Sequence, residues 1–352
     1  MGMVETLAPA KINLHLGVSR ACDEHGYHLL RTVMCRLDLA DVVRVEELPA
    51  AESVLTEGAA GCTRAASAGE GHAAPDTAAA PSVCAAPATG GGSPDVLNVP
   101  AGCAGTPRIE LTCEPDPVGD ARANLAYRAA EALATRLGRA AHLRIVIEKR
   151  IPSQAGLGGG SSDAAAVLRC LAELWGLPAT DACVVEVAQG LGADVPFFLY
   201  EGTCLLERRG DVFVERLPLP QMSLVLAKPP VGVSTPAAYR IFDELGTPTP
   251  APDDLLAVLR AYVSDESFPG VPRAIARACA NNLQPAACAI EPQVVETLAW
   301  LAEQPEGLAA PLLCGSGACC ALFVGDDEAA RAIARRATTR GLWSCPARTL
   351  AS

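Results

Sequence analysis

The residues best suited to chemistry lie in the segment IVIEKRIPSQAGLGGGSSDAAAVLRCLAELW, where a strand-like run meets a cluster of glycines and then a helical pattern. Glycine lets the backbone approach a ligand closely and adopt positive φ. The unpaired N–H groups and the dipole at a helix start together bind phosphate. Ser161 and Ser162 stand at the expected helix start, where serine either caps the helix or reaches a phosphate. The segment therefore predicts a phosphate-binding loop, with a plain glycine-rich turn capped by serine as the alternative.

Two common nucleotide-binding motifs do not match this loop. A Walker A loop ends in Gly-Lys-Ser or Gly-Lys-Thr, and no lysine follows these glycines. A dinucleotide fingerprint needs a third glycine where Ser161 stands, and an acidic residue about 20 positions later in a regular βαβ unit. Glu173 and Asp181 lie on or beside predicted helices instead. Neither motif explains the loop.

Two further clusters complete the pattern. Lys11 and Asn13 are two residues apart on a predicted strand in APAKINLHLGV, so their side chains share one face. Asp194, in GADVPFF, stands in a turn between a predicted helix and an apolar run. An isolated Lys or Asp is usually a solvated surface charge. Here both occur with the glycine loop and with a second glycine motif, GSGACCALF, and this combination favours a functional site.

The elements that must position these residues interleave without a regular βα repeat, which predicts an α+β fold in two lobes. Periodicity predicts strands over 4–47 (interrupted by a loop at DEHGYH), 108–114, 142–152, 203–217 and 223–231, then strand–turn–strand over 312–325 and a short final strand. Helices are predicted over 123–138, 161–177, 181–190, 236–245 and 327–339, with others between residues 250 and 310.

The composition changes abruptly between about residues 49 and 107. This stretch is rich in Ala, Gly, Pro, Ser and Thr, with no aromatic residue and few charges. Such a sequence buries too little apolar surface to offset its ordering entropy, so we expect a flexible insertion outside the core. We predict an N-terminal lobe over 1–208 that carries this insertion and a C-terminal lobe over 209–352.

Charge and composition exclude several classes of protein. The chain has 28 Lys and Arg against 40 Asp and Glu, a net charge of −12, which disfavours binding to nucleic acid or to an anionic membrane surface. No stretch approaches the roughly 20 apolar residues that span a bilayer. The start of the chain lacks a secretory pattern, so we expect a cytoplasmic protein. The 15 cysteines include no Cys-x-x-Cys pair, and we expect reduced, mostly buried thiols. His25 and His28 lack ligand partners at metal-binding spacing, so no metal site is predicted from the residues.

Five motifs occur in the same order as in a known family: PAKINL, the following Gly26-Tyr27-His28, GLGGGSSDAA, GADVPFF and GSGAC. The sequence resembles the GHMP kinase superfamily, and within it the kinases that phosphorylate 4-diphosphocytidyl-2-C-methyl-D-erythritol (CDP-methylerythritol). The resemblance covers nearly the whole chain apart from 49–107. It implies an N-terminal lobe like ribosomal protein S5 domain 2 and a ferredoxin-like C-terminal lobe.

The resemblance also implies a reaction. It is the ATP-dependent phosphorylation of the C2 hydroxyl of CDP-methylerythritol in non-mevalonate isoprenoid biosynthesis, with Mg²⁺ as the metal that accompanies ATP. Another small-molecule GHMP kinase is the nearest alternative. A GHMP-fold protein that only binds a ligand is the alternative of a different class, and the retained Lys11 and Asp194 argue against it. The expected partners are ATP and CDP-methylerythritol, with no nucleic acid, membrane or obligate protein partner.

The resemblance implies roles for those residues of this chain that stand at positions matching the family's motifs. Lys11 and Asp194 resemble the catalytic pair, with Asp194 as the general base, and Asn13 resembles a substrate-positioning residue. Tyr27 and Tyr239 resemble the aromatic residues on the two faces of the cytosine ring, and His28 the residue at its polar edge. The residues implied for ATP are Asn124, Lys149, Gly156, Leu157, Gly158, Gly159, Gly160, Ser161 and Ser162, with Gly315, Ser316 and Gly317 as a third motif that lines the cleft.

Overall fold

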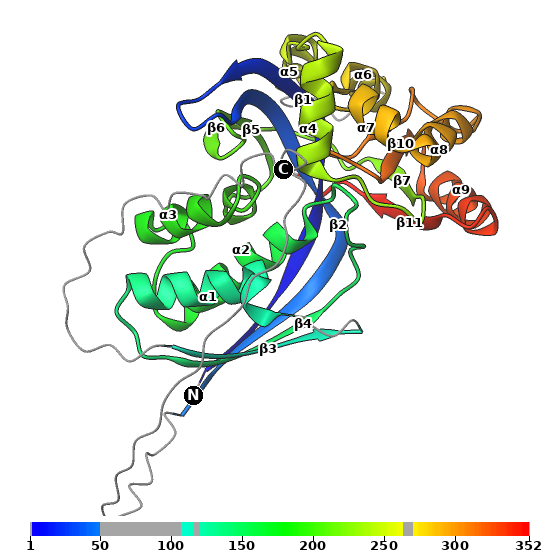
Figure 1. Cartoon of the computed structure of the whole chain (residues 1–352). Helices are drawn as coiled ribbons and strands as arrows, with labels where there is room; N and C mark the ends of the chain where they lie inside the picture. Colours follow the sequence, from blue (N-terminus) through cyan, green and yellow to red (C-terminus); the bar gives the residue numbers. More distant parts are fainter. Residues whose placement is uncertain (1, 50–106, 116–119, 263–269, 352) are drawn as a thin grey trace, which may run out of the picture. The chain divides into compact units, whose positions relative to one another are not determined.

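The structure is a computed structural model that describes residues 2–49, 107–115, 120–262 and 270–351 (Figure 1). The insertion predicted over 49–107 falls on residues 50–106, which lie outside the described residues. The described strands form a seven-stranded and a four-stranded sheet.

The larger sheet is built on a long antiparallel hairpin, with the strand order β3-β4-β2-β1-β8 and with β5 and β6 attached to β2. Strand β3 runs parallel to β4, and β8 runs parallel to β1. Its strands are β1 (Met3–Cys22), β2 (His28–Leu48), β3 (Arg108–Glu114), β4 (His142–Glu148), β5 (Thr203–Glu207), β6 (Val212–Leu217) and β8 (Ala280–Asn281).

Helices α1 (Leu125–Arg136) and α2 (Gly159–Leu174) lie against one face of the larger sheet, and α3 (Ala182–Leu191) packs on these two helices (Figure 1). Alanine dominates the buried side of α1 and α2, so the helices approach each other and the sheet closely. Two short 3₁₀ helices, η1 (Ala121–Ala123) and η2 (Pro196–Leu199), precede α1 and follow α3.

The smaller sheet has the antiparallel order β11-β7-β10-β9. Its strands are β7 (Ser223–Lys228), β9 (Leu312–Leu313), β10 (Cys320–Val324) and β11 (Trp343–Arg348). The helices of this part of the chain are α4 (Thr235–Leu245), α5 (Asp253–Ala261), α6 (Val271–Ala278), α7 (Gln284–Ile290), α8 (Pro292–Ala302) and α9 (Asp327–Thr339).

Strand β1 is buried from Ala8 to Val18. Ile12 and Leu14 pack with Leu224 and Leu226 of β7 in one cluster. Successive side chains of a strand point to opposite faces, so Lys11 and Asn13 lie on the face away from β7. The alternation therefore places these two polar residues on the face that carries the site, and the register shift between Asn13 and His15 interrupts it.

Most predicted elements are confirmed, and the helix over 327–339 has the predicted bounds. The strands predicted over 142–152 and 223–231 end earlier, at Glu148 and Lys228, and the helix predicted over 161–177 ends at Leu174. The single strand predicted over 203–217 is instead the β5–β6 hairpin, whose turn contains Gly210 at φ 93°. The cysteines of the described residues are free thiols, as expected. Among the described helices, none combines the length and the apolar composition that a membrane span requires. The lobe boundary after residue 208 stays a prediction, and beyond it β6 still pairs in the larger sheet.

Candidate active site

Lys11 and Asp194 lie together although they are far apart in the sequence. The Lys11 Nζ is 3.2 Å from the Asp194 Oδ2. Lys11 sits on β1 and is only 3% exposed, whereas the side chain of Asp194, between α3 and η2, is 33% exposed. This arrangement suits proton transfer from a hydroxyl group. The solvent-exposed carboxylate can accept the proton, and the buried ammonium can stabilise the negative charge that develops on the hydroxyl oxygen.

Asn13 fixes the position of the Lys11 ammonium. Lys11 Nζ donates to Asn13 Oδ1 at 2.8 Å, which confirms that the two side chains share one face. Asn13 Nδ2 donates to Thr32 Oγ1 at 2.8 Å, and the Thr32 hydroxyl donates to the His15 carbonyl at 2.7 Å. The β1–β2 register shifts on each side of this pair, between Pro9 and Lys11 and between Asn13 and His15. Such irregularities re-aim side chains near active sites.

The glycine loop forms one wall of a cavity of about 780 Å³. Helix α2 begins at the loop with Gly158 as N-cap, at φ 72°, and no side chain caps it. The serine-capped alternative is therefore wrong, and the Ser162 hydroxyl is buried without a partner among the described residues. The N–H groups of the first turn of α2 remain available for an anion. The residues predicted for ATP that line the cavity are Asn124, Lys149, Gly156, Leu157, Gly158, Gly159, Gly160 and Ser161.

The glycine loop and the Lys11–Asp194 pair form one unit. The Lys11 N–H donates to the Leu157 carbonyl at 2.9 Å. A Cβ atom on Gly158 would lie 3.0 Å from Lys11 Cγ, so the lysine stem packs directly against the loop backbone. These contacts therefore fix the position of the Lys11 side chain relative to the start of α2.

The third motif, 315–317, packs behind the glycine loop. A Cβ on Gly315 would lie 2.8 Å from the Gly156 carbonyl oxygen and 3.4 Å from Lys11 Nζ. Asn281 Nδ2 donates to the Gly315 carbonyl at 2.7 Å. Ser316 Oγ instead lies 2.8 Å from Thr235 Oγ1 at the start of α4. The motif thus supports the loop and Lys11, and its role toward a nucleotide stays a prediction.

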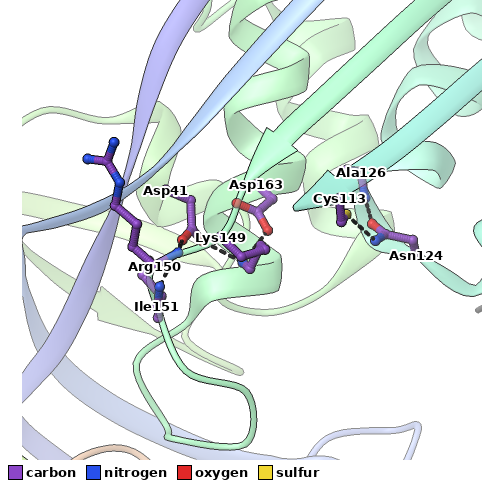
Figure 2. A network of polar contacts seen from close by, with 8 residues as sticks. All are labelled: Asp41, Cys113, Asn124, Ala126, Lys149, Arg150, Ile151 and Asp163. Atoms are coloured by element: carbon purple, nitrogen blue, oxygen red, sulfur yellow. Dashed lines mark hydrogen bonds and ion pairs between the residues drawn. The ribbon is translucent and has the colours of Figure 1, made fainter. Parts of the chain in front are cut away.

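Lys149 lies at the wall of the cavity between two carboxylates, Asp41 and Asp163 (Figure 2). Burial alone would lower its pKa, but the two carboxylates outweigh burial and raise it. Asn124, the other residue predicted near adenosine, caps α1 through a 2.8 Å bond from the Ala126 N–H. Its Nδ2 lies 3.9 Å from the Cys113 sulfur.

The residues predicted around cytosine lie near the start of β2 and on α4. His28 and Tyr239 stack with ring centroids 5.4 Å apart. His28 Nδ1 lies 2.7 Å from the Ser19 carbonyl and its Nε2 lies 3.3 Å from Asp243. Burial, and secondarily Asp194, raises the pKa of Tyr239 to about 12. Tyr27 is 55% exposed, with the Arg209 guanidinium 5.3 Å from its ring centre. The predicted cytosine sandwich stays untested by this arrangement.

Three residues of the site received no role from the sequence: Asp41, Asp163 and Asn281. Asp41 interrupts the apolar pattern of ADVVRV at a fully buried position, and this interruption was a usable signal. Asp163 stands inside the glycine motif itself. Asn281 carried no signal, because β8 is only two residues long.

Comparison with known proteins places this arrangement in a family. The model of the GHMP kinases N terminal domain matches residues 124–202, and that of the GHMP kinases C terminal matches residues 256–341. A 4-diphosphocytidyl-2-C-methyl-D-erythritol kinase of Pelotomaculum thermopropionicum is 39% identical over 228 residues, which is 65% of this chain and 76% of that protein. One of Geobacter sp. is 31% identical over 99% of this chain and 100% of that protein.

A crystal structure of 4-(cytidine 5'-diphospho)-2C-methyl-D-erythritol kinase superposes with a TM-score of 0.67 at 26% identity, over 99% of this chain and 100% of that one. The expected two-lobed GHMP fold is therefore confirmed. The two family models and the identity to these relatives show that the chain belongs to the 4-diphosphocytidyl-2-C-methyl-D-erythritol kinase family of the GHMP kinases.

Proposed function

We propose that this chain transfers the γ-phosphoryl group of ATP to the C2 hydroxyl of CDP-methylerythritol, as a step of non-mevalonate isoprenoid biosynthesis in the cytoplasm. The observation that carries the proposal is the Lys11–Asp194 pair, held beside the uncapped start of α2. The names of relatives that match nearly the whole chain support the choice of substrate.

In the proposed reaction Asp194 accepts the proton of the C2 hydroxyl, and the hydroxyl oxygen attacks the γ-phosphorus. The bond from that phosphorus to the bridging oxygen breaks, and ADP leaves with the electron pair. The Lys11 ammonium stabilises the charge that develops on the attacking oxygen, and Asn13 holds the ammonium in place. Phosphoryl transfer depends mainly on positioning and charge stabilisation, and this constellation supplies both.

The nucleotide would lie in the 780 Å³ cavity, with its phosphates against the N–H groups at the start of α2. Lys149 and Asn124 would face the adenosine part. Tyr27 and Tyr239 would hold the cytosine ring, and His28 would contact its polar edge.

Mg²⁺ belongs to the proposal as a companion of ATP. Among the described residues no group of three or more His, Cys, Asp or Glu side chains could hold a metal ion. Magnesium retains water and binds phosphate oxygens readily, so the triphosphate itself would be its main ligand. When bound, the ion neutralises charge on the phosphates. This role suits a chain with a net charge of −12.

The test is a coupled assay of ADP release by the purified chain with ATP and CDP-methylerythritol. Turnover with CDP-methylerythritol, and little with homoserine or mevalonate, supports the proposal. Turnover with one of the simpler alcohols and none with CDP-methylerythritol would identify a different GHMP kinase activity.

A further inference from the structure

A buried cluster of two carboxylates and one ammonium lies at the wall of the proposed nucleotide cavity (Figure 2). Asp41 is fully buried, and its Oδ1 accepts the backbone N–H groups of Arg150 and Ile151. Its Oδ2 accepts from Lys149 Nζ, which also donates to Asp163 Oδ2 at 2.7 Å. The cluster therefore ties β2, the end of β4 and the first turns of α2 to one ammonium group.

The cluster faces the cavity as well as the core. Both Lys149 and Asp163 line the cavity. A Cβ on Gly159 would lie 3.5 Å from Lys149 Nζ, so the ammonium stands beside the first residue of α2. Asp163 is only 4% exposed, and its Oδ1 has no hydrogen-bond partner among the described residues. An unpaired carboxylate oxygen is thus buried next to the place where phosphates would bind.

The charges of this cluster are unbalanced when both carboxylates are ionised, since two anions then share one cation. Burial raises the pKa of Asp163 to about 7, against the opposing effect of Lys149 and with a further contribution from Asp41. A further titratable neighbour is Cys113 of β3, whose pKa is raised by burial and by Asp163. Asp120 and Arg150 also line the cavity. Asp163 can therefore change its charge near neutral pH.

A bound nucleotide brings several negative charges to the same cavity. These charges disfavour an ionised Asp163 and favour its neutral form, in which the cluster carries one cation and one anion. A neutral Asp163 still accepts the hydrogen bond from Lys149 through one oxygen, and its added proton can be donated to a neighbouring acceptor.

We propose that Asp163 is a positioning residue of the nucleotide site, which holds Lys149 against the glycine loop and takes up a proton when the nucleotide binds. This inference rests on the proposed use of ATP. Nucleotide binding is then accompanied by proton uptake at Asp163. Since the bound state holds more protons, the affinity for nucleotide falls as the pH rises.

Titration calorimetry with ADP and no added metal tests this inference on the full chain. Repeating the titration at pH 7.5 in two buffers with different ionisation enthalpies gives the number of protons taken up. If bound ADP raises the pKa of Asp163 by one unit, the wild-type chain takes up about half a proton, and its affinity falls about fivefold from pH 7 to pH 9. The phosphates of ADP are largely ionised over this range, so they contribute little to the change.

Three variants complete the experiment. Asp163→Asn keeps an acceptor for Lys149 and should bind ADP with no proton uptake at this site and little change between pH 7 and pH 9. Asp163→Ala removes the acceptor and should weaken ADP binding at both pH values. Asp254→Asn removes the same charge from an exposed position on α5 and should behave like the wild type.

Each result decides the question. Equal proton uptake by the wild type and Asp163→Asn overturns the inference while leaving ATP use intact. A wild-type affinity that does not change between pH 7 and pH 9 overturns it even if the variants fail to fold. Failure of the wild type to bind ADP at all would overturn the nucleotide site itself, and with it the proposed function.

Discussion

Gly156→Ala probes the contact between the glycine loop and the third motif. Gly156 adopts φ 72°, and a Cβ at this position would lie 1.9 Å from the Cys314 carbonyl oxygen. Real Cβ contacts essentially never fall below 3.0 Å, so the two backbones must separate by about 1 Å. The left-handed conformation costs about 1–2 kcal/mol for alanine. Overpacking adds about 1–3 kcal/mol. We expect an unfolding free energy lower by about 2–5 kcal/mol.

The separation should also reduce turnover, because the Lys11 backbone N–H donates a hydrogen bond to the carbonyl of the next loop residue, Leu157. Misplacement by about 1 Å commonly costs on the order of 10²-fold in rate. Gly138→Ala is the matched control: Gly138 has φ 63°, but nothing lies within 4 Å of the added Cβ. The control should lose about 1–2 kcal/mol of stability and no activity.

Urea unfolding and steady-state kinetics on both variants separate the two effects. Equal losses of stability in Gly156→Ala and Gly138→Ala, with full turnover in both, would refute the reasoning that the loop is held by close backbone packing.

Three further predictions follow from the described contacts. Tyr239→Ala should raise KM for CDP-methylerythritol about five- to a hundredfold, the range expected for lost stacking on a base, while KM for ATP stays nearly constant. Tm should fall as well, because Tyr239 also packs on His28. Equal rises of KM for both substrates would show that Tyr239 has a packing role alone. Relative to Asp163→Asn, the unfolding free energy of the wild type should fall as pH rises from about 4 to 7, by at most about 1.4 kcal/mol per pH unit, because the folded chain keeps a proton on Asp163 that the unfolded chain releases. Urea unfolding of both chains across this range measures the difference, and identical profiles would exclude the effect. Leu48 and Arg108 both pair with His142, from opposite sides of β4, so about 10 Å separates the two chain ends that flank the insertion. Replacing 51–105 with about six Gly and Ser residues should therefore preserve Tm and turnover. Aggregation of this variant would contradict the prediction.

Local patterns were enough to predict the parts of the site that depend on one element. The alternation at the start of KINLHL placed Lys11 and Asn13 on one face, and the glycine cluster predicted a loop that leads into the start of α2. The β5–β6 hairpin was missed because RRGD reads as a continuation of a polar strand, although Gly210 allows the turn.

Contacts between distant segments could not be predicted in the same way. Asp41, Lys149 and Asp163 belong to three elements that meet only after the sheet and α2 have packed. Asn281 supports Gly315 from a two-residue strand that has no periodicity of its own. The relation of Asp194 to Lys11 came from the family resemblance, and the 3.2 Å separation of the two groups agrees with it.

The most direct test of the account is the turnover of Asp194→Asn compared with its affinity for ATP. The variant keeps the size of the side chain and removes the proton acceptor beside Lys11. We predict that phosphorylation of CDP-methylerythritol falls by about 10²–10⁴-fold, the usual loss for a positioned general base, while the dissociation constant of ATP stays near the wild-type value. Wild-type turnover in the purified variant would contradict the assignment of Asp194 and the mechanism built on it.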